Sequence, residues 1–118
     1  NVLCGNTDDH ARNHAAFYDG NALELTPAYD ICPQNRSTGI ASQAMALVDG
    51  QNQSTLALCK KAAHKFNLTE VQANEDIESL QETIRTYWDQ ACEEAKMTDM
   101  EKKFFWKRQF LNPSIYEG

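Results

Sequence analysis

Apolar and polar residues in the second half of the chain alternate with the period of an α-helix. Three helices are predicted: residues 55–66, residues 69 to about 96, and residues 98 to about 111, before Asn112-Pro113. Ser54 is the expected cap of the first helix, and Thr69 and Thr98 each begin a capping-box pattern. The long middle helix should bury a stripe that steps by three and four residues: Ala73, Ile77, Leu80, Ile84, Tyr87 and Ala91.

The first third of the chain predicts a β-hairpin. The segments "AAFY" and "LEL" flank Asp19-Gly20, which is a hairpin-type turn signal. Leu23 and Leu25 are expected to face inward, with Glu24 in solvent. Pro27 should end the pairing because it has no N–H to donate.

These patterns together predict a mainly α fold with a short β-hairpin, in a single domain over residues 1–118. Residues 1–32 should form a polar loop and the hairpin, and residues 55–118 a helical scaffold. The intervening residues 33–54 are mostly polar and irregular, with a short apolar patch "MALV".

Composition narrows the class of protein. With 42% hydrophobic residues, 118 residues can bury a core, and a net charge of -6 argues against nucleic acid or an anionic membrane as a direct partner. There is no apolar run of membrane-spanning length. The cysteines are far apart and form no C-x-x-C, which favours reduced thiols in the cytoplasm over a zinc site or a disulfide framework: Cys4, Cys32, Cys59 and Cys92.

Chemistry is concentrated in the opening stretch "GNTDDHARN". Asp8 and Asn13 are spaced as D-x-x-x-x-N, the arrangement of a protein-kinase catalytic loop. In such a loop the Asp accepts a proton from a substrate hydroxyl, and the Asn offers a neutral oxygen to Mg²⁺. The hairpin then returns the chain, and "PAYDI" places Asp30 where a kinase keeps its second metal-holding carboxylate.

The segments "GNTDDHARNHAAFYDG" and "LELTPAYDICP" resemble the C-terminal lobe of the HipA-type serine/threonine kinases, the toxins of bacterial toxin–antitoxin pairs. The resemblance continues through "QAMALVDGQ" and "TLALCKKAAHKFNLTEVQA". It implies the helical C-lobe of a protein-kinase-like fold, with Mg²⁺ and ATP as cofactors. It also implies a protein serine as substrate and an antitoxin protein as a partner.

The resemblance implies a role for each matching residue. Asp8 would be the catalytic Asp, and His10 would orient the loop through a hydrogen bond. Asn13 and Asp30 would hold Mg²⁺, and Arg12 would lie near the phosphates.

The chain lacks the sequence signals of a kinase N-terminal lobe. It contains no G-x-G-x-x-G and no strand lysine of the kinase type, and it opens on "NVLCG" without an initiator Met. We interpret it as part of a longer kinase whose N-terminal lobe binds the nucleotide. These residues alone are therefore expected to be inactive.

Two other interpretations remain open. His10 and His14, four residues apart, could form the metal site of a hydrolase with Asp8 or Asp9, although the segment reads as a loop and lacks H-E-x-x-H. The chain could also be a non-catalytic helical interaction domain or a degenerate kinase homologue, because Asp and Asn are ordinary turn residues.

Overall fold

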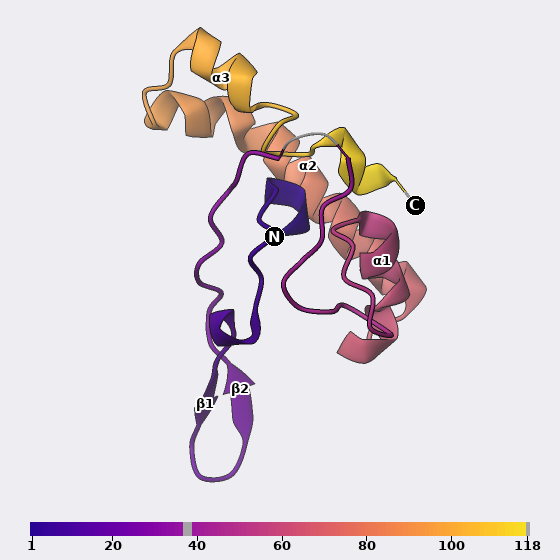
Figure 1. Cartoon of the computed structure of the whole chain (residues 1–118). Helices are drawn as coiled ribbons and strands as arrows, with labels where there is room; N and C mark the ends of the chain where they lie inside the picture. The colour runs from indigo at the N-terminus through magenta and orange to yellow at the C-terminus, as the bar shows by residue number, and fades with distance from the viewer. Residues whose placement is uncertain (37–38, 118) are drawn as a thin grey trace.

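A computed structural model describes residues 1–36 and 39–117, in which three α-helices and one two-stranded antiparallel sheet form. The predicted mainly α fold with a short hairpin is confirmed. Residues 37 and 38 of the expected irregular segment lie outside the described residues. Figure 1 shows the long helix running across the molecule, with the hairpin pointing away from it. The elements are β1 (Ala16–Tyr18), β2 (Leu23–Leu25), α1 (Leu56–Lys61), α2 (Glu70–Glu94) and α3 (Asp99–Phe105).

Both predicted capping boxes are present. The Thr69 hydroxyl accepts from the N–H of Gln72 at 3.2 Å, and Gln72 Oε1 accepts from the N–H of Thr69 at 2.9 Å. Thr98 and Glu101 repeat the exchange at the start of α3, at 3.2 and 2.7 Å. Each pair satisfies N–H groups that the first helical turn leaves without intrahelical partners.

The first predicted helix differs from the structure in its cap and its length. Thr55, not Ser54, caps α1, because its hydroxyl accepts from the N–H of Leu58 at 3.3 Å. Ser54 is fully buried, and its hydroxyl accepts from Gln43 instead. The helix also ends at Lys61, and a separate 3₁₀ turn follows at Ala63–Phe66.

The third helix is shorter than predicted. It ends at Phe105 rather than near Asn112, because Trp106 has an extended backbone (ψ 129°) and Lys107 a left-handed one (φ 65°); Leu111 is also left-handed, with φ of 51°. This path returns the chain so that Leu111 is fully buried.

The buried stripe of α2 is predicted only in part. Ala73 is buried and Ile77 and Ile84 pack against the core, but Leu80 and Tyr87 are each 57% exposed. Ala91 is also exposed. Gln81 and Cys92 are buried instead. The face of α2 that packs against the core is therefore rotated about the helix axis relative to the predicted apolar stripe.

Among the described residues, the core consists of two small apolar clusters. In one, Leu56 of α1 packs with Leu111 and Ile115, and α2 and the N-terminal residues cover them. In the other, Val48 from the "MALV" patch packs against Leu58 and Ala62. Burying an aliphatic side chain of this kind stabilises the fold by about 1.5–3 kcal/mol. Within the described ranges, no helix has both the length and the apolar character that a membrane span requires.

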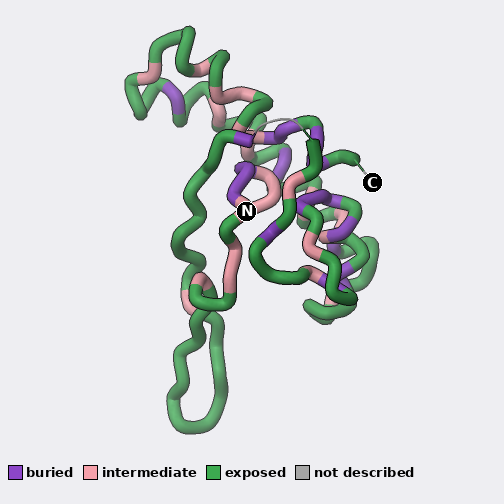
Figure 2. Tube along the Cα trace, in the orientation of Figure 1, coloured by how far each residue is buried: buried purple, intermediate pink, exposed green. Residues whose placement is uncertain are grey.

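The hairpin arm, which we define as residues 14–25, is exposed along its whole length (Figure 2). Leu25 pairs with Ala16 and Leu23 with Tyr18, so these four side chains share one face of the ribbon. Leu23 and Leu25 are 74% and 77% exposed, so the expectation that they face inward is wrong for this chain. The arm projects from the body, and no part of the described chain lies over it.

The tip of the arm is a four-residue loop rather than the two-residue turn that Asp19-Gly20 suggests. The Asp19 carboxylate accepts from the N–H groups of Ala22 and Asn21, at 2.9 and 2.8 Å. These bonds hold the pKa of Asp19 below its ordinary value because they favour the charged form. Asp19 thus organises the turn, as the sequence suggests, but with a longer loop.

Candidate active site at the base of the hairpin arm

The structure brings Asn13 and Asp30 into direct contact. Asn13 ends a short 3₁₀ turn, Ala11–Asn13, and its Nδ2 donates to Asp30 Oδ2 at 2.8 Å across 17 residues of sequence. The Asn13 Oδ1 accepts from the N–H of His10 at 3.3 Å. The two residues expected to hold a metal therefore lie side by side where the hairpin arm leaves the body.

Asp30 has an unusual backbone conformation. Its φ of 57° lies in the left-handed region, which costs an L-residue roughly 1–2 kcal/mol and which Asp tolerates better than most residues. Hydrogen bonds on both sides fix this segment. The Asp30 carbonyl accepts from Asn6 Nδ2 at 3.3 Å, and the hydroxyl of Tyr29 donates to the carbonyl of Arg12 at 2.7 Å. The strained residue thus lies at the predicted site, where such strain is often found.

Asp8 presents its carboxylate to solvent. Its side chain is 69% exposed, while its N–H donates to Asn6 Oδ1 at 2.9 Å. The nearest basic group is His10 Nε2, 4.0 Å from Asp8 Oδ2. The His10 Nδ1 is buried and has no hydrogen-bond partner among the residues that the structure describes. In this conformation the loop is held by the backbone N–H of His10 and not by its ring.

A buried glutamine fixes the loop to the body of the molecule. Gln43 Nε2 donates to the carbonyl of Asn6 at 2.7 Å and to the hydroxyl of Ser54 at 3.0 Å. Its Oε1 accepts from the N–H of Asp9 at 3.4 Å. Gln43 and Asn6 are each only 4% exposed, so these bonds are shielded from water. Sequence reasoning did not identify Gln43, because a single Gln in an irregular segment carries no periodic signal.

Two further predicted residues lie at the edge of this site. His14 Nε2 lies 2.6 Å from Asp9 Oδ1, which closes the 3₁₀ turn from outside. Arg12 is exposed, and its guanidinium makes no ion pair within the described part of the chain. It is therefore free to contact a ligand.

The arrangement does not support the alternative of a zinc hydrolase. His14 binds Asp9, whereas His10 lies beside Asp8. In residues 1–36 and 39–117 no group of three or more His, Cys, Asp and Glu side chains is close enough to hold a metal ion. Asn13 and Asp30 would instead offer one amide oxygen and one carboxylate once the Asn13 amide turns, because here its Nδ2 faces Asp30 and its Oδ1 accepts from the N–H of His10. This donor set fits Mg²⁺, which binds few protein oxygens and keeps waters or phosphate oxygens as its other ligands.

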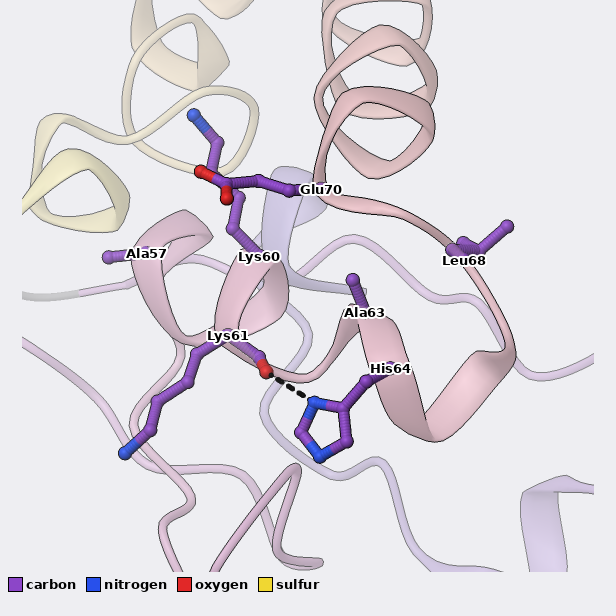
Figure 3. A pocket seen from close by; sticks show the side chains of 7 residues that line it. All are labelled: Ala57, Lys60, Lys61, Ala63, His64, Leu68 and Glu70. Carbon is purple, nitrogen blue, oxygen red and sulfur yellow. Dashed lines mark hydrogen bonds between the residues drawn. The ribbon is translucent and has the colours of Figure 1, made fainter.

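A hollow lined in part by basic side chains lies on other elements. It has a volume of about 450 Å³ and lies between α1, the 3₁₀ turn after it and the start of α2 (Figure 3). Lys60, Lys61 and His64 line it beside the carboxylate of Glu70. In Figure 3 the His64 ring points at the Lys61 carbonyl, 3.1 Å away. None of its lining residues comes from the loop that carries Asp8 and Asn13 or from the hairpin arm.

The family model described as "HipA-like C-terminal domain" matches residues 1–98. This chain belongs to that family. The matched region of the HipA-like domain includes the loop with Asp8 and Asn13, the hairpin arm, Asp30 and the whole of α2, and it ends before α3. The resemblance expected from the opening motifs is therefore confirmed. A search of curated proteins and a search of solved structures each found no match.

Proposed function

We propose that this HipA-like domain is the catalytic-loop side of a protein serine/threonine kinase, within the C-lobe of a kinase-like fold. The observation that carries the proposal is the contact between Asn13 and Asp30, 2.8 Å apart at the base of the hairpin arm. Family membership and the exposed carboxylate of Asp8 on the same loop support it. The donor set fits Mg²⁺ bound with ATP.

In this proposal each residue of the loop has one task. Asp8 orients the substrate serine and accepts the proton of its hydroxyl. The serine Oγ then forms a bond to the γ-phosphorus, the bond from that phosphorus to the bridging oxygen breaks, and ADP leaves with the electron pair. Asn13 and Asp30 hold Mg²⁺, which when bound neutralises phosphate charge. Arg12 contacts the phosphates, and His10 stays beside Asp8.

The exposed hairpin arm supports the proposal that a second lobe completes the site. Tyr18, Leu23 and Leu25, which share one face of the ribbon, are between 68% and 77% exposed, and an isolated two-stranded hairpin is only marginally stable in water. We propose that a nucleotide-binding N-terminal lobe packs on this apolar surface. Other proposed partners are a protein substrate and an antitoxin protein, and the proposed location is the cytoplasm. Residues 1–118 alone should then be inactive.

The test uses the intact parent protein and radiolabelled ATP. Asp8→Asn and Asp30→Asn should each lower serine phosphorylation by about 100-fold or more, as expected for loss of a general base or a metal ligand. Asp49→Asn is the matched control. Asp49 is also an exposed Asp with a left-handed backbone, φ 50°, but it lies outside the site. Circular dichroism should show that all three variants remain folded.

Full activity in either the Asp8 or the Asp30 variant would refute the assigned roles. Phosphorylation catalysed by residues 1–118 alone would refute the need for a second lobe. A parent protein that neither binds Mg²⁺-ATP nor transfers phosphate would favour the non-catalytic alternative.

A further inference from the structure

We propose that Asp9 and His14 form a positioning clip that fixes the hairpin arm relative to the body, and with it the Asn13–Asp30 pair relative to Asp8. His14 Nε2 and Asp9 Oδ1 are 2.6 Å apart, and the two residues flank the 3₁₀ turn that carries Asn13. Neither side chain needs to touch a substrate. Both act by holding the turn between them, which carries Asn13, and the hairpin arm that begins at His14.

The two residues belong to different parts of the molecule. Asp9 is tied to the body, because its N–H donates to Gln43, whose other bonds reach Asn6 and Ser54. His14 is the first residue of the hairpin arm, with an extended backbone that leads into β1. Since the arm is exposed throughout, packing does little to set its direction. Side-chain contacts at its base must do so.

The clip holds one of the two stems that leave the body. The second stem, at Asp30, is held by the bond from Asn6 Nδ2 to the Asp30 carbonyl, at 3.3 Å. The contact between Asp9 and His14 is the shorter of the two. With both stems fixed, Asn13 and Asp30 keep one position relative to the loop that carries Asp8. Without the clip, the first stem keeps its bonds within the arm and the turn and the two bonds that join Arg12 and Asn13 to the second stem, but it loses its own side-chain contact with Asp9.

The clip requires a donor and an acceptor, not a particular charge state. A neutral imidazole with its proton on Nε2 donates to a carboxylate, as does the imidazolium. An exposed contact of this type adds little to global stability. Its loss should therefore change the arm and the metal-binding pair while leaving the unfolding transition unchanged, which separates positioning from a general structural role.

The test compares His14→Ala with His14→Gln in residues 1–118. The amide of Gln can donate from near the position of the imidazole Nε2. Order in the arm is measured by ¹⁵N relaxation, and metal binding by Mn²⁺ broadening of the Asn13 side-chain amide signal. His64→Ala is the control, since His64 is also an exposed histidine with one hydrogen bond and lies on a different element (Figure 3).

We expect His14→Ala to increase fast motion in β1 and β2 and to raise the Mn²⁺ dissociation constant about two- to fivefold, the range for one exposed charged hydrogen bond. His14→Gln and His64→Ala should match the unaltered chain. The metal-binding effect rests on the proposed function, whereas the relaxation result does not. If Mn²⁺ fails to bind the unaltered chain, the proposed function loses support and the relaxation data still decide the clip.

The proposal is overturned if His14→Ala leaves the motion of the arm unchanged, or if His14→Gln is as disordered as His14→Ala. A double-mutant cycle gives a second criterion. Asp9→Ala and His14→Ala combined should loosen the arm no more than either alone, because both remove the same contact. Additive effects would show that the two residues act independently and would also overturn the proposal.

Discussion

Replacing Gly5 by Ala should destabilise the fold through one close approach. Gly5 is buried, has a φ of 72° and directly precedes Asn6. A Cβ built on it would overlap with the backbone oxygen of Gln34 and lie 3.0 Å from that of Gln109. Both obstacles are backbone atoms, so neither can move aside by a change of rotamer.

The cost has two parts. The left-handed conformation costs an L-residue roughly 1–2 kcal/mol, and relieving an overpacked contact costs about 1–3 kcal/mol more. The smaller entropy of Ala in the unfolded chain returns about 0.4–1 kcal/mol. We therefore expect Gly5→Ala to lower the free energy of unfolding by about 2–4 kcal/mol, a large part of the roughly 5–15 kcal/mol of a typical domain.

Gly50→Ala is the matched control. Gly50 has nearly the same φ, 71°, but a Cβ there would have no heavy atom within 4 Å. Gly50→Ala should lower the free energy of unfolding by only about 1 kcal/mol. Urea unfolding followed by tryptophan fluorescence measures both variants, with the slope m unchanged if the transition stays two-state. Equal losses in the two variants would refute the close-contact argument, because only Gly5 has neighbours that a Cβ would meet.

Three further changes test other parts of the structure. Gln43→Leu should cost about 2–4 kcal/mol in urea unfolding, because it leaves buried polar groups without partners, whereas Gln53→Leu at an exposed position should cost little. Trp88→Ala removes a half-buried ring whose centroid lies 5.1 Å from that of Trp106, so it should lower the free energy of unfolding by about 1.5–3 kcal/mol, and amide hydrogen exchange should accelerate first in α3. Burial raises the pKa of the Cys59 thiol above its ordinary value near 9, so its alkylation rate, followed by mass spectrometry, should reach a plateau at higher pH in the folded than in the urea-unfolded chain. Unchanged stability in the Gln43 or Trp88 variants, or coincident alkylation profiles, would contradict the respective argument.

Features that depend on a few neighbouring residues were predictable from the sequence. The capping boxes at Thr69 and Thr98 are satisfied within three residues, so the pattern alone determines them. The hairpin arm was predictable for the same reason, because the Asp19 carboxylate accepts from N–H groups only two and three residues along the chain and so organises the turn. The pairing of Asn13 with Asp30 was expected from the family resemblance, and the short arm allows the two stems to meet. Their functional roles remain predictions.

Features that depend on distant residues were not predictable. The inward face of α2 is set in part by Tyr116, whose hydroxyl donates to Gln81 Oε1 at 2.7 Å, 35 residues away. A hydrophobic stripe cannot show that such a polar contact will be buried, so Leu80 was wrongly expected inside. Ser54 does not cap α1, because its hydroxyl accepts a hydrogen bond from the distant Gln43 instead. Leu23 would be buried only if another surface covered the arm. The alternation of apolar and polar residues along the arm carries no information about such a surface.

The position of Asn13 and Asp30 on opposite stems of one hairpin has a consequence for protein engineering. The entropy of closing a loop grows only with the logarithm of its length, so doubling the length of the connection costs about 0.6 kcal/mol. The exposed tip at residues 19–22 should therefore accept an inserted tag or fluorescent label without separating the two stems. Cleavage at the same tip would make their pairing depend on non-covalent contacts between two separate pieces: the β1–β2 pairing, the bonds at the base of the arm, and the packing of Val2 and Leu3 in the core.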